Sequence, residues 1–202
     1  MPGRSKNGRL LHFDRIARVV PPRFLFVGYL GPIDRMSLLM ATMAKPIEGF
    51  PNYGVTHRGE VFNLDTGRNM VLSPTMNGDL TVGLVRDKHQ YRYSVKGLVA
   101  RAFVPGEDEI FNTPILLDND KTNLRIENIV WRPRWFAWQY TRQFAEPRSW
   151  HVFGPLMDVE TLSEYDNYID AATRHGLLCE DIRESIYNQK RTFPTQQLFA
   201  YW

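Results

Sequence analysis

The sequence predicts an α+β fold, with a small N-terminal β module, a ββα unit and a C-terminal helix-turn-helix. Three observations predict it. From residue 46 to residue 95, short apolar runs alternate with turn residues. Between residues 115 and 144, two strand-like runs enclose a polar loop and precede a helical segment. Near the C-terminus, two amphipathic segments flank a glycine turn, a spacing typical of paired helices.

The β module is predicted from runs of β-forming residues that are bounded by turn residues. The predicted strands cover residues 53–56, 60–64, 69–73, 80–86 and 91–95. Asn77-Gly78 is a dipeptide that short hairpin turns favour, because both residues tolerate positive φ. Apolar residues then recur three and four positions apart from Val95 to Phe103, which predicts a helix. Pro105 ends this helix.

Two further modules follow. Strands at 115–117 and 126–131 enclose the polar loop, and a helix rich in Arg and Trp is predicted from about residue 133 to residue 144. Pro147 and Gly154-Pro155 indicate a linker. Helices over 165–175 and 180–188, joined by Gly176-Leu177-Leu178, have the spacing of a helix-turn-helix. The predicted boundaries are a basic extension at 1–42, a β-rich module at 43–104, the ββα unit at 105–148 and the helix-turn-helix at 149–202.

The positive charge of the chain is concentrated at its N-terminal end. The 202 residues carry a net charge of +3. Residues 1–42 hold seven basic and two acidic side chains, whereas residues 43–202 hold 18 basic and 20 acidic ones. Because phosphate neutralisation depends on the local number of Lys and Arg, any affinity of the body for DNA has to come from local patches and geometry.

Two interpretations of residues 1–42 stay open. Met43 begins a stretch, MAKPIEGFPNYGV, that reads like a natural protein start, so the upstream segment is either disordered or an over-annotated start. The alternative is a basic arm that lies along DNA.

No apolar run approaches the ~20 residues that span a bilayer, and no signal peptide is expected. A single cysteine, Cys179, excludes an internal disulfide, and we expect a cytoplasmic protein.

Three stretches, in this order and spacing, resemble phage-type HNH homing endonucleases. They are GFPNYGVTHRGEVFNLDTGRNMVLSPTMNGDLTVGL, YSVKGLVARAFVPGEDE and DNDKTNLRIENIVW. The first is similar to a NUMOD4-like β module, the second to a family helix, and the third to the loop of the ββα, His-Me finger-like unit. The last 38 residues resemble a NUMOD1-like helix-turn-helix through a shared set of residues, namely Ala171, Ala172, Gly176, Ile182, Ile186 and Trp202.

The resemblance implies a nuclease centre whose reactive positions have been replaced. In the family, a histidine acts as general base, and a divalent metal is held by the preceding residue and by a residue of the following helix. Those three positions are Leu116, Ile115 and about Ala137 here. Aliphatic side chains neither accept a proton from water nor bind a hard cation. We therefore expect no catalytic residue, no metal ligand and no cofactor, with Mg²⁺ required only if the site has been rearranged.

The scaffold of the same motif is kept. Asp118, Asn123 and Asn128 match the residues that shape the family's loop between the two strands. Asp118 and Asp120 are weak metal-binding candidates, but the resemblance implies a structural turn at this place. The five histidines, His12, His57, His89, His151 and His175, all lie outside the motif. A histidine in a turn, a surface loop or a helix end is the simpler interpretation of His57, His89 and His175.

The DNA contacts are predicted on the loop, the helix of the ββα unit and the second helix of the helix-turn-helix. The predicted residues are Lys121, Arg125, Arg132, Arg134, Arg142, Arg183, Asn188, Gln189, Lys190 and Arg191. Double-stranded DNA is the expected partner. One stretch counts against it, because residues 158–170 carry five acidic side chains and no basic one. This stretch would repel phosphate, or it would bind a basic protein partner.

Three functions remain open. The leading one is a catalytically inactive, sequence-preferring DNA-binding protein, recruited as a regulator. The second is an active homing or nicking endonuclease with a rearranged metal site. The third is a phage structural or assembly protein on the same fold. A phage-infected or prophage-bearing bacterial host is implied by the resemblance alone.

Overall fold

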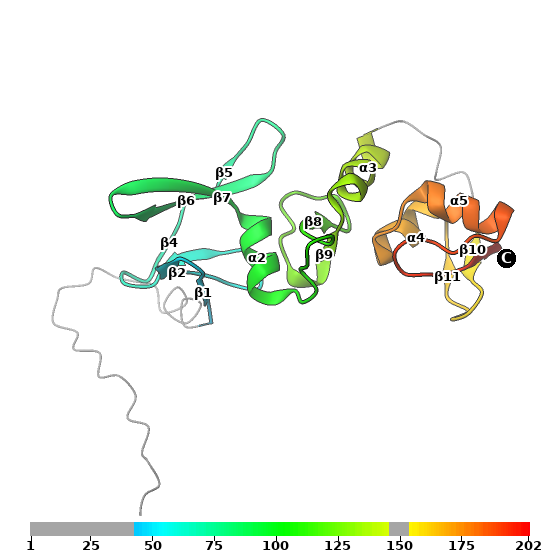
Figure 1. The fold of residues 1–202 in the computed structure, drawn as a ribbon, viewed down its shortest axis with the longest axis horizontal. Coiled ribbons are helices and arrows are strands. Elements are labelled where there is room, and N and C mark those ends of the chain that lie inside the picture. The colour runs from blue at the N-terminus through cyan, green and yellow to red at the C-terminus, as the bar shows by residue number, and fades with distance from the viewer. Residues whose placement is uncertain (1–42, 146–153) are drawn as a thin grey trace, which may run out of the picture. The chain divides into compact units, whose positions relative to one another are not determined.

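A computed structural model describes residues 43–145 and 154–202 (Figure 1). All of them belong to one unit of the chain. The basic extension at 1–42 and the predicted linker at Pro147 lie outside the described residues. In the described part, strands and helices are mixed along the chain as expected of an α+β protein. No helix of that part is long and apolar enough to cross a membrane.

The first sheet is an antiparallel meander of four strands in the order β1-β2-β3-β4. Its strands are β1 (Lys45–Ile47), β2 (Phe50–Val55), β3 (Val61–Asn63) and β4 (Arg68–Asn69). Val55 pairs with Val61, and both are fully buried. The turn between β2 and β3 holds Gly59 at φ +85°, with the side chain of Leu124 directly against it. This contact joins the sheet to the loop of the ββα unit.

The second sheet has three strands in the order β5-β6-β7, made of β5 (Ser73–Pro74), β6 (Leu80–Arg86) and β7 (His89–Ser94). The predicted strand at 69–73 was therefore wrong, because its two ends belong to different sheets. Between them Met70 and Leu72 pack on the core, while Val71 is exposed. The β6–β7 turn uses Asp87 and Lys88 at positive φ and contains no glycine, which sequence reasoning did not anticipate.

Helix α2 (Val95–Phe103) confirms the predicted helix and closes the main core. It buries Val95, Leu98, Val99 and Ala100 against both sheets and the ββα unit. Such a stripe of apolar residues at helical spacing removes most of its surface from water, which is the main stabilising term of folding. The core formed by α2 therefore holds the β module and the ββα unit together.

The ββα unit consists of β8 (Thr113–Leu116), β9 (Ile129–Arg132) and α3 (Arg134–Ala145). Strands β8 and β9 are antiparallel, with Ile115 opposite Val130. The predicted second strand began at residue 126, but Ile126–Asn128 form a 3-10 turn, η1. Two hydrogen bonds account for the difference: the Asn128 amide donates to the Arg125 carbonyl within the turn, and the Ile126 amide donates to the carbonyl of the distant His57.

The C-terminal part has the two predicted helices, α4 (Tyr168–His175) and α5 (Cys179–Asn188). The first helix begins three residues later than predicted, because the side chain of Asn167 caps it at the Asp170 amide. Gly176 ends it at φ 62°, as the turn pattern required. A three-stranded sheet that was not predicted flanks the helices, with β11 (Glu164–Tyr165), β10 (Leu156–Asp158) and β12 (Phe199–Tyr201) in that order. The helix pair is thus part of a small α+β module.

Candidate nucleic-acid interface

The loop between β8 and β9 is held by a network of three polar side chains. The Asn128 amide nitrogen donates to Asp118 Oδ1 (2.7 Å) and to the Asn123 carbonyl (2.8 Å), and its oxygen accepts from the Asp118 amide (3.0 Å). Asn123 Nδ2 donates to Asp118 Oδ2 at 2.6 Å. The three residues expected to shape the loop therefore lie together and bond to one another. They give the loop between the strands a defined conformation.

We expect Asn128→Ala to lower the free energy of unfolding by about 2 kcal/mol, because a buried amide with three hydrogen bonds is removed and its partners stay unsatisfied. Urea unfolding of the full chain measures this. Glu127→Ala, at the exposed neighbouring position, is the matched control and should change stability by less than about 0.5 kcal/mol. Equal stability of the Asn128→Ala and wild-type proteins would contradict a structural role for the network.

The three positions that carry the reaction in the family lie in apolar core. Ile115 packs with Phe136, Ala137 and Tyr140, whereas Leu116 faces the opposite way into the main core. Ile115, Leu116 and Ala137 are 3%, 6% and 8% exposed. An attacking water and a phosphate need a polar, accessible site, and these side chains offer neither a donor nor an acceptor. The residues present do not fit a metal ion at this place.

The carboxylates nearest to these positions are engaged within the loop. Asp118 Oδ1 accepts from the Asp120 amide (2.8 Å) in addition to its bonds with Asn128. Asp120 Oδ1 accepts from both the amide (2.9 Å) and the hydroxyl (2.7 Å) of Thr122, and these hydrogen bonds lower the pKa of the Asp120 carboxyl. Among residues 43–145 and 154–202, no group of three or more His, Cys, Asp or Glu is placed to hold a metal ion.

Arg132, predicted to contact DNA, is instead a buried structural residue. It is 8% exposed, and its guanidinium donates to the carbonyls of Gly176 (3.1 Å), His175 (2.8 Å) and Trp131 (2.8 Å). Two of those carbonyls end helix α4, where the helix dipole favours a cation. Arg132 therefore joins β9 to the C-terminal helix pair and has no face left for a phosphate.

Arg132→Ala should lower the free energy of unfolding by about 3 kcal/mol, because three carbonyls lose a buried charged donor. Thermal or urea unfolding measures the change. The exposed Arg134→Ala, two residues away, is the control and should stay within about 0.5 kcal/mol of wild type. A stable Arg132→Ala protein with weakened DNA binding would restore the original prediction.

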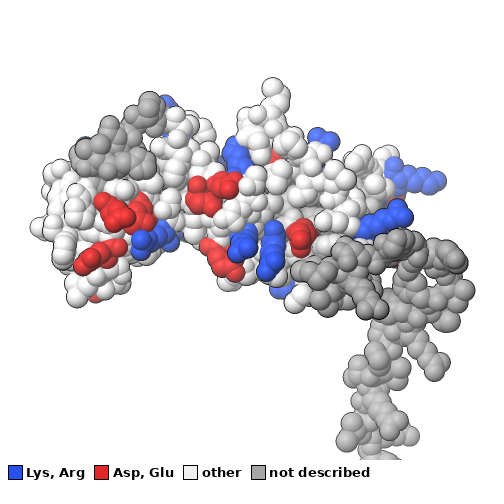
Figure 2. Space-filling view, turned by 180° about the vertical axis from the view of Figure 1, so that it is seen from behind, with Lys and Arg blue, Asp and Glu red and all other residues white. Residues whose placement is uncertain are grey.

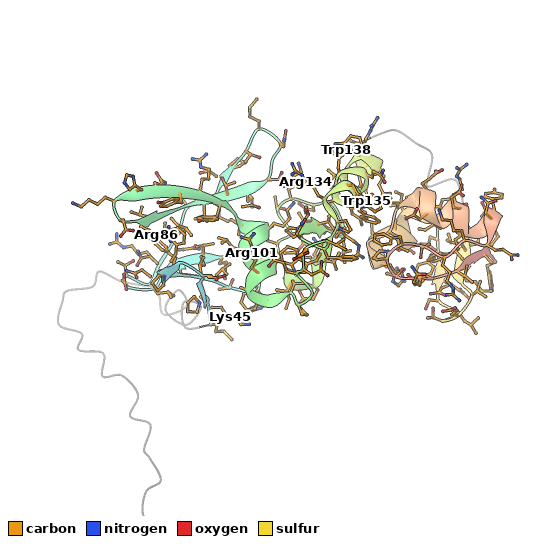
Figure 3. The ribbon with its side chains drawn as sticks, viewed as in Figure 1. Lys45, Arg86, Arg101, Arg134, Trp135 and Trp138 are labelled. Atoms are coloured by element: carbon orange, nitrogen blue, oxygen red, sulfur yellow. The ribbon has the colours of Figure 1, made fainter. Side chains whose placement is uncertain are left out.

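The exposed face of α3 carries cations and aromatic rings but no acid. Its sequence, RWFAWQYTRQFA, buries Phe136, Ala137 and Tyr140 and exposes Arg134, Trp135, Trp138 and Arg142 (Figure 3). The Arg142 guanidinium lies 5.0 Å from the Trp138 ring centre. Two of the predicted DNA-contacting residues, Arg134 and Arg142, are therefore on one accessible helix face.

The loop residues Lys121 and Arg125 differ in accessibility. Lys121 Nζ donates to the Asn77 carbonyl and lies 4.0 Å from Asp79, so it joins the loop to the β5–β6 turn. Arg125 is exposed. Within the described residues, no ion pair of Arg125 is present. Arg125 is therefore the more accessible of these two predicted contact residues.

The predicted reading helix, α5, has most of its polar side chains paired with neighbouring acids. Arg183 binds Glu180 and Glu184, and Asn188 Nδ2 donates to Glu184 at 2.8 Å. Beyond the helix, Arg191 binds Glu160 at 2.7 Å. Gln189 takes a left-handed conformation that ends the helix, and the next residue, Lys190, is exposed. Exposed ion pairs contribute little to stability, so a phosphate competes with these carboxylates at small cost.

The acidic stretch at 158–170 is largely used inside the module. Asp158 is buried and accepts from Gln197 Nε2 (2.8 Å) and the Glu160 amide (2.9 Å). Asp170 binds Arg174 at 2.8 Å, and Glu160 binds Arg191. Glu164 and Asp166 are exposed. Three of the five acidic side chains therefore have partners inside the module, and the expectation of a basic protein partner stays untested.

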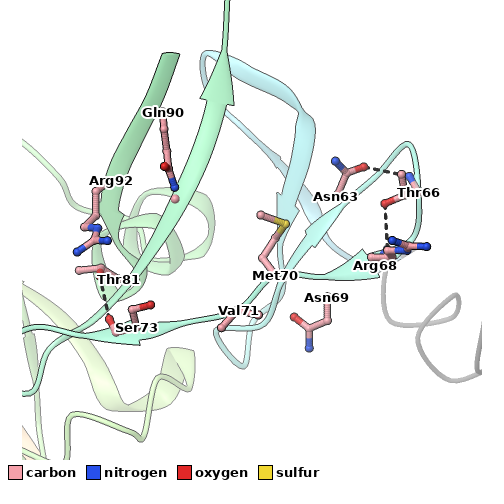
Figure 4. A pocket seen from close by; sticks show the side chains of 11 residues that line it. Asn63, Thr66, Arg68, Asn69, Met70, Val71, Ser73, Thr81, Gln90 and Arg92 are labelled. Atoms are coloured by element: carbon pink, nitrogen blue, oxygen red, sulfur yellow. Dashed lines mark hydrogen bonds between the residues drawn. The ribbon is translucent and has the colours of Figure 1, made fainter. Parts of the chain in front are cut away.

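A polar cleft in the β module was not found from the sequence. It has a volume of about 530 Å³ and lies between β4 and the β5-β6-β7 sheet (Figure 4). Arg68, Asn69, Gln90 and Arg92 line it, and none of its lining residues is acidic. The Gln90 side chain lies across Gly83, where any Cβ would collide with it. The signal available in the sequence was the alternation of Gln90 and Arg92 on one face of a strand.

The surface as a whole does not form a single positive field. On the face drawn in Figure 2, acidic and basic side chains lie beside one another along the described residues. This agrees with the near-balanced charge of residues 43–202. Net charge therefore does not single out any face of the described residues as a nucleic-acid interface.

Comparison with known proteins adds one structural likeness. A scan against protein-family models finds no match, and a search of the curated proteins finds none. Among solved structures, the chain is similar to the one titled "DNA binding and cleavage by the HNH homing endonuclease I-HmuI", with 19% identity and a TM-score of 0.47. The match covers 78% of this chain and 97% of that chain.

Proposed function

We propose that this chain is a double-stranded DNA-binding protein of the HNH homing-endonuclease lineage that no longer cleaves DNA and acts as a regulator. The observation that carries the proposal is the ββα unit itself. Its loop residues Asp118, Asn123 and Asn128 keep their mutual hydrogen bonds, while Ile115 and Leu116 are buried in apolar core. The residues that shape the loop match those of the HNH pattern, whereas the positions of the general base and the metal ligand carry aliphatic side chains.

The proposed contact surface follows from accessibility and charge. Arg134 and Arg142 on α3 and Arg125 on the loop are accessible cations of the ββα unit. Arg68 and Arg92 in the cleft supply a second patch on the β module. Phosphate contacts of this kind fix position, and base-edge contacts by amides such as Gln90 and Asn69 add sequence preference. Arg132 is left out, because it is buried.

The helix α5 is proposed as a secondary contact. Lys190 is exposed beyond its end, and the ion pairs of Arg183 and Arg191 with their glutamates are on the surface. When a phosphate replaces the glutamate partner of one of these arginines, one ion pair is formed and another is lost. The net gain in binding free energy per arginine is therefore small. The ββα unit and the β module therefore carry the larger part of the proposed affinity.

A gel-shift series and a plasmid-nicking assay on the full chain, with Mg²⁺ or Mn²⁺ and increasing salt, test the proposal together. We expect binding that weakens as salt rises, without nicking, because phosphate contacts release counterions. Metal-dependent nicking that Asp118→Ala together with Asp120→Ala abolishes would support the rearranged nuclease instead. Absence of binding even at low salt would favour a structural or assembly protein.

A further inference from the structure

One aromatic residue of α3 is largely exposed. Trp138 is 61% exposed. Within the described residues, no aromatic ring packs against it, and the Arg142 guanidinium lies 5.0 Å from its ring centre. A large apolar side chain held in water at a helix surface gains nothing from burial there. Such a ring is informative when its surroundings indicate what covers it.

The surroundings of Trp138 indicate a nucleic acid. Arg134, Trp138 and Arg142 are spaced four residues apart, so they lie in one row along the helix. The two arginines are about 12 Å apart along the helix axis, at 1.5 Å per residue. No acidic side chain is present in α3. The row thus presents one indole ring between two guanidinium groups, which complements an apolar base face between charged phosphates.

The neighbouring tryptophan is different and serves as an internal comparison. Trp135 is 55% exposed, but its ring centre lies 5.6 Å from that of Phe193 and 5.7 Å from that of Phe136. Phe193 in turn stacks on Phe111 at 5.9 Å. Trp135 therefore belongs to an aromatic cluster of the fold, whereas Trp138 does not.

We propose that Trp138 is a wedge that stacks on a base of bound double-stranded DNA and opens one base step, with Arg134 and Arg142 on the flanking phosphates. The inference rests on the proposed function and adds a distortion of the DNA to it. Apolar side chains inserted from the minor groove partly unstack a base step and bend the duplex. Stacking of a base on an aromatic ring contributes about 1–3 kcal/mol, which corresponds to roughly a 5- to 150-fold change in affinity.

The test uses the full chain and a duplex selected by gel shift from a random-sequence pool. The base analogue 2-aminopurine, whose fluorescence rises when a base is unstacked, is placed at successive positions of that duplex. We expect wild type to raise the fluorescence at one step, Trp138→Ala to abolish the rise and weaken binding about tenfold, and Trp138→Phe to retain most of both. Trp135→Ala is the matched control and should keep the rise.

The outcomes separate this inference from the proposed function. Binding of the wild type without any fluorescence rise, or a rise that Trp138→Ala retains, would overturn the wedge and leave DNA binding standing. Failure of the wild type to bind any duplex at low salt would overturn both. Circular dichroism of each variant shows that the fold is kept, which the exposure of Trp138 leads us to expect.

Discussion

Placing the reactive residues of HNH homing endonucleases at positions 115 and 116 should unfold the protein rather than give it cleavage activity. We expect Ile115→Asp combined with Leu116→His to lower the free energy of unfolding by about 5 kcal/mol or more at pH 7. Both positions are in apolar core; each change removes a buried aliphatic side chain and buries an unpaired polar group. Urea unfolding measures the loss, and a nicking assay with Mg²⁺ should show no activity.

The matched control leaves an aliphatic side chain at position 115. Ile115→Val should cost about 1 kcal/mol, because one buried methyl group is removed. A double variant that folds as stably as wild type, or one that nicks DNA with Mg²⁺, would show that a polar site still exists between β8 and α3. In that case the description of the centre as closed core would be wrong.

Removal of the two α3 arginines should give the largest loss of DNA affinity. We expect Arg134→Ala with Arg142→Ala to weaken binding about 100-fold and to lower the slope of log affinity against log salt by about 1.8, at about 0.9 for each phosphate contact. Both side chains are exposed on a helix face that has no acid. Gel shifts or fluorescence anisotropy across a salt series measure both quantities.

Arg101→Ala is the matched control for this double variant. Arg101 is also an exposed arginine near the end of a helix, but it pairs with Glu107 at 3.3 Å and lies on α2. Its removal should leave the salt slope unchanged. An equal loss of affinity in the control would mean that binding follows net charge, and the α3 face would then have no special place in the interface.

Local sequence patterns predicted an element correctly where residues close together in the chain determine its structure. The helix from Val95 to Phe103 and the turn at Gly176 follow from apolar spacing and from the need for a left-handed residue. The replacement of the reactive residues by Ile115 and Leu116 was also visible in the sequence. So were the loop residues Asp118 and Asn128, whose hydrogen bonds span a short segment of chain.

Local sequence patterns did not predict those features whose contacting residues come from distant parts of the chain. The sheet β11-β10-β12 pairs residues 156–158 with residues 199–201, a pairing that no local period indicates. The strand predicted at 69–73 divides between two sheets, because Met70 and Leu72 pack on the core while the chain crosses from one to the other. The polar cleft likewise collects residues from three separate stretches.

By itself, the sequence determined that Ile115, Leu116 and Ala137 cannot serve as a base or a metal ligand, because an aliphatic side chain can do neither in any fold. Only the tertiary structure decided which cations remain accessible. Arg132 and Arg134 look equivalent two residues apart, yet one is bound to the carbonyls of Gly176 and His175 and the other is exposed. The physical reason is that burial depends on what packs against a residue, and the neighbour of Arg132 is an element more than 40 positions further along the chain.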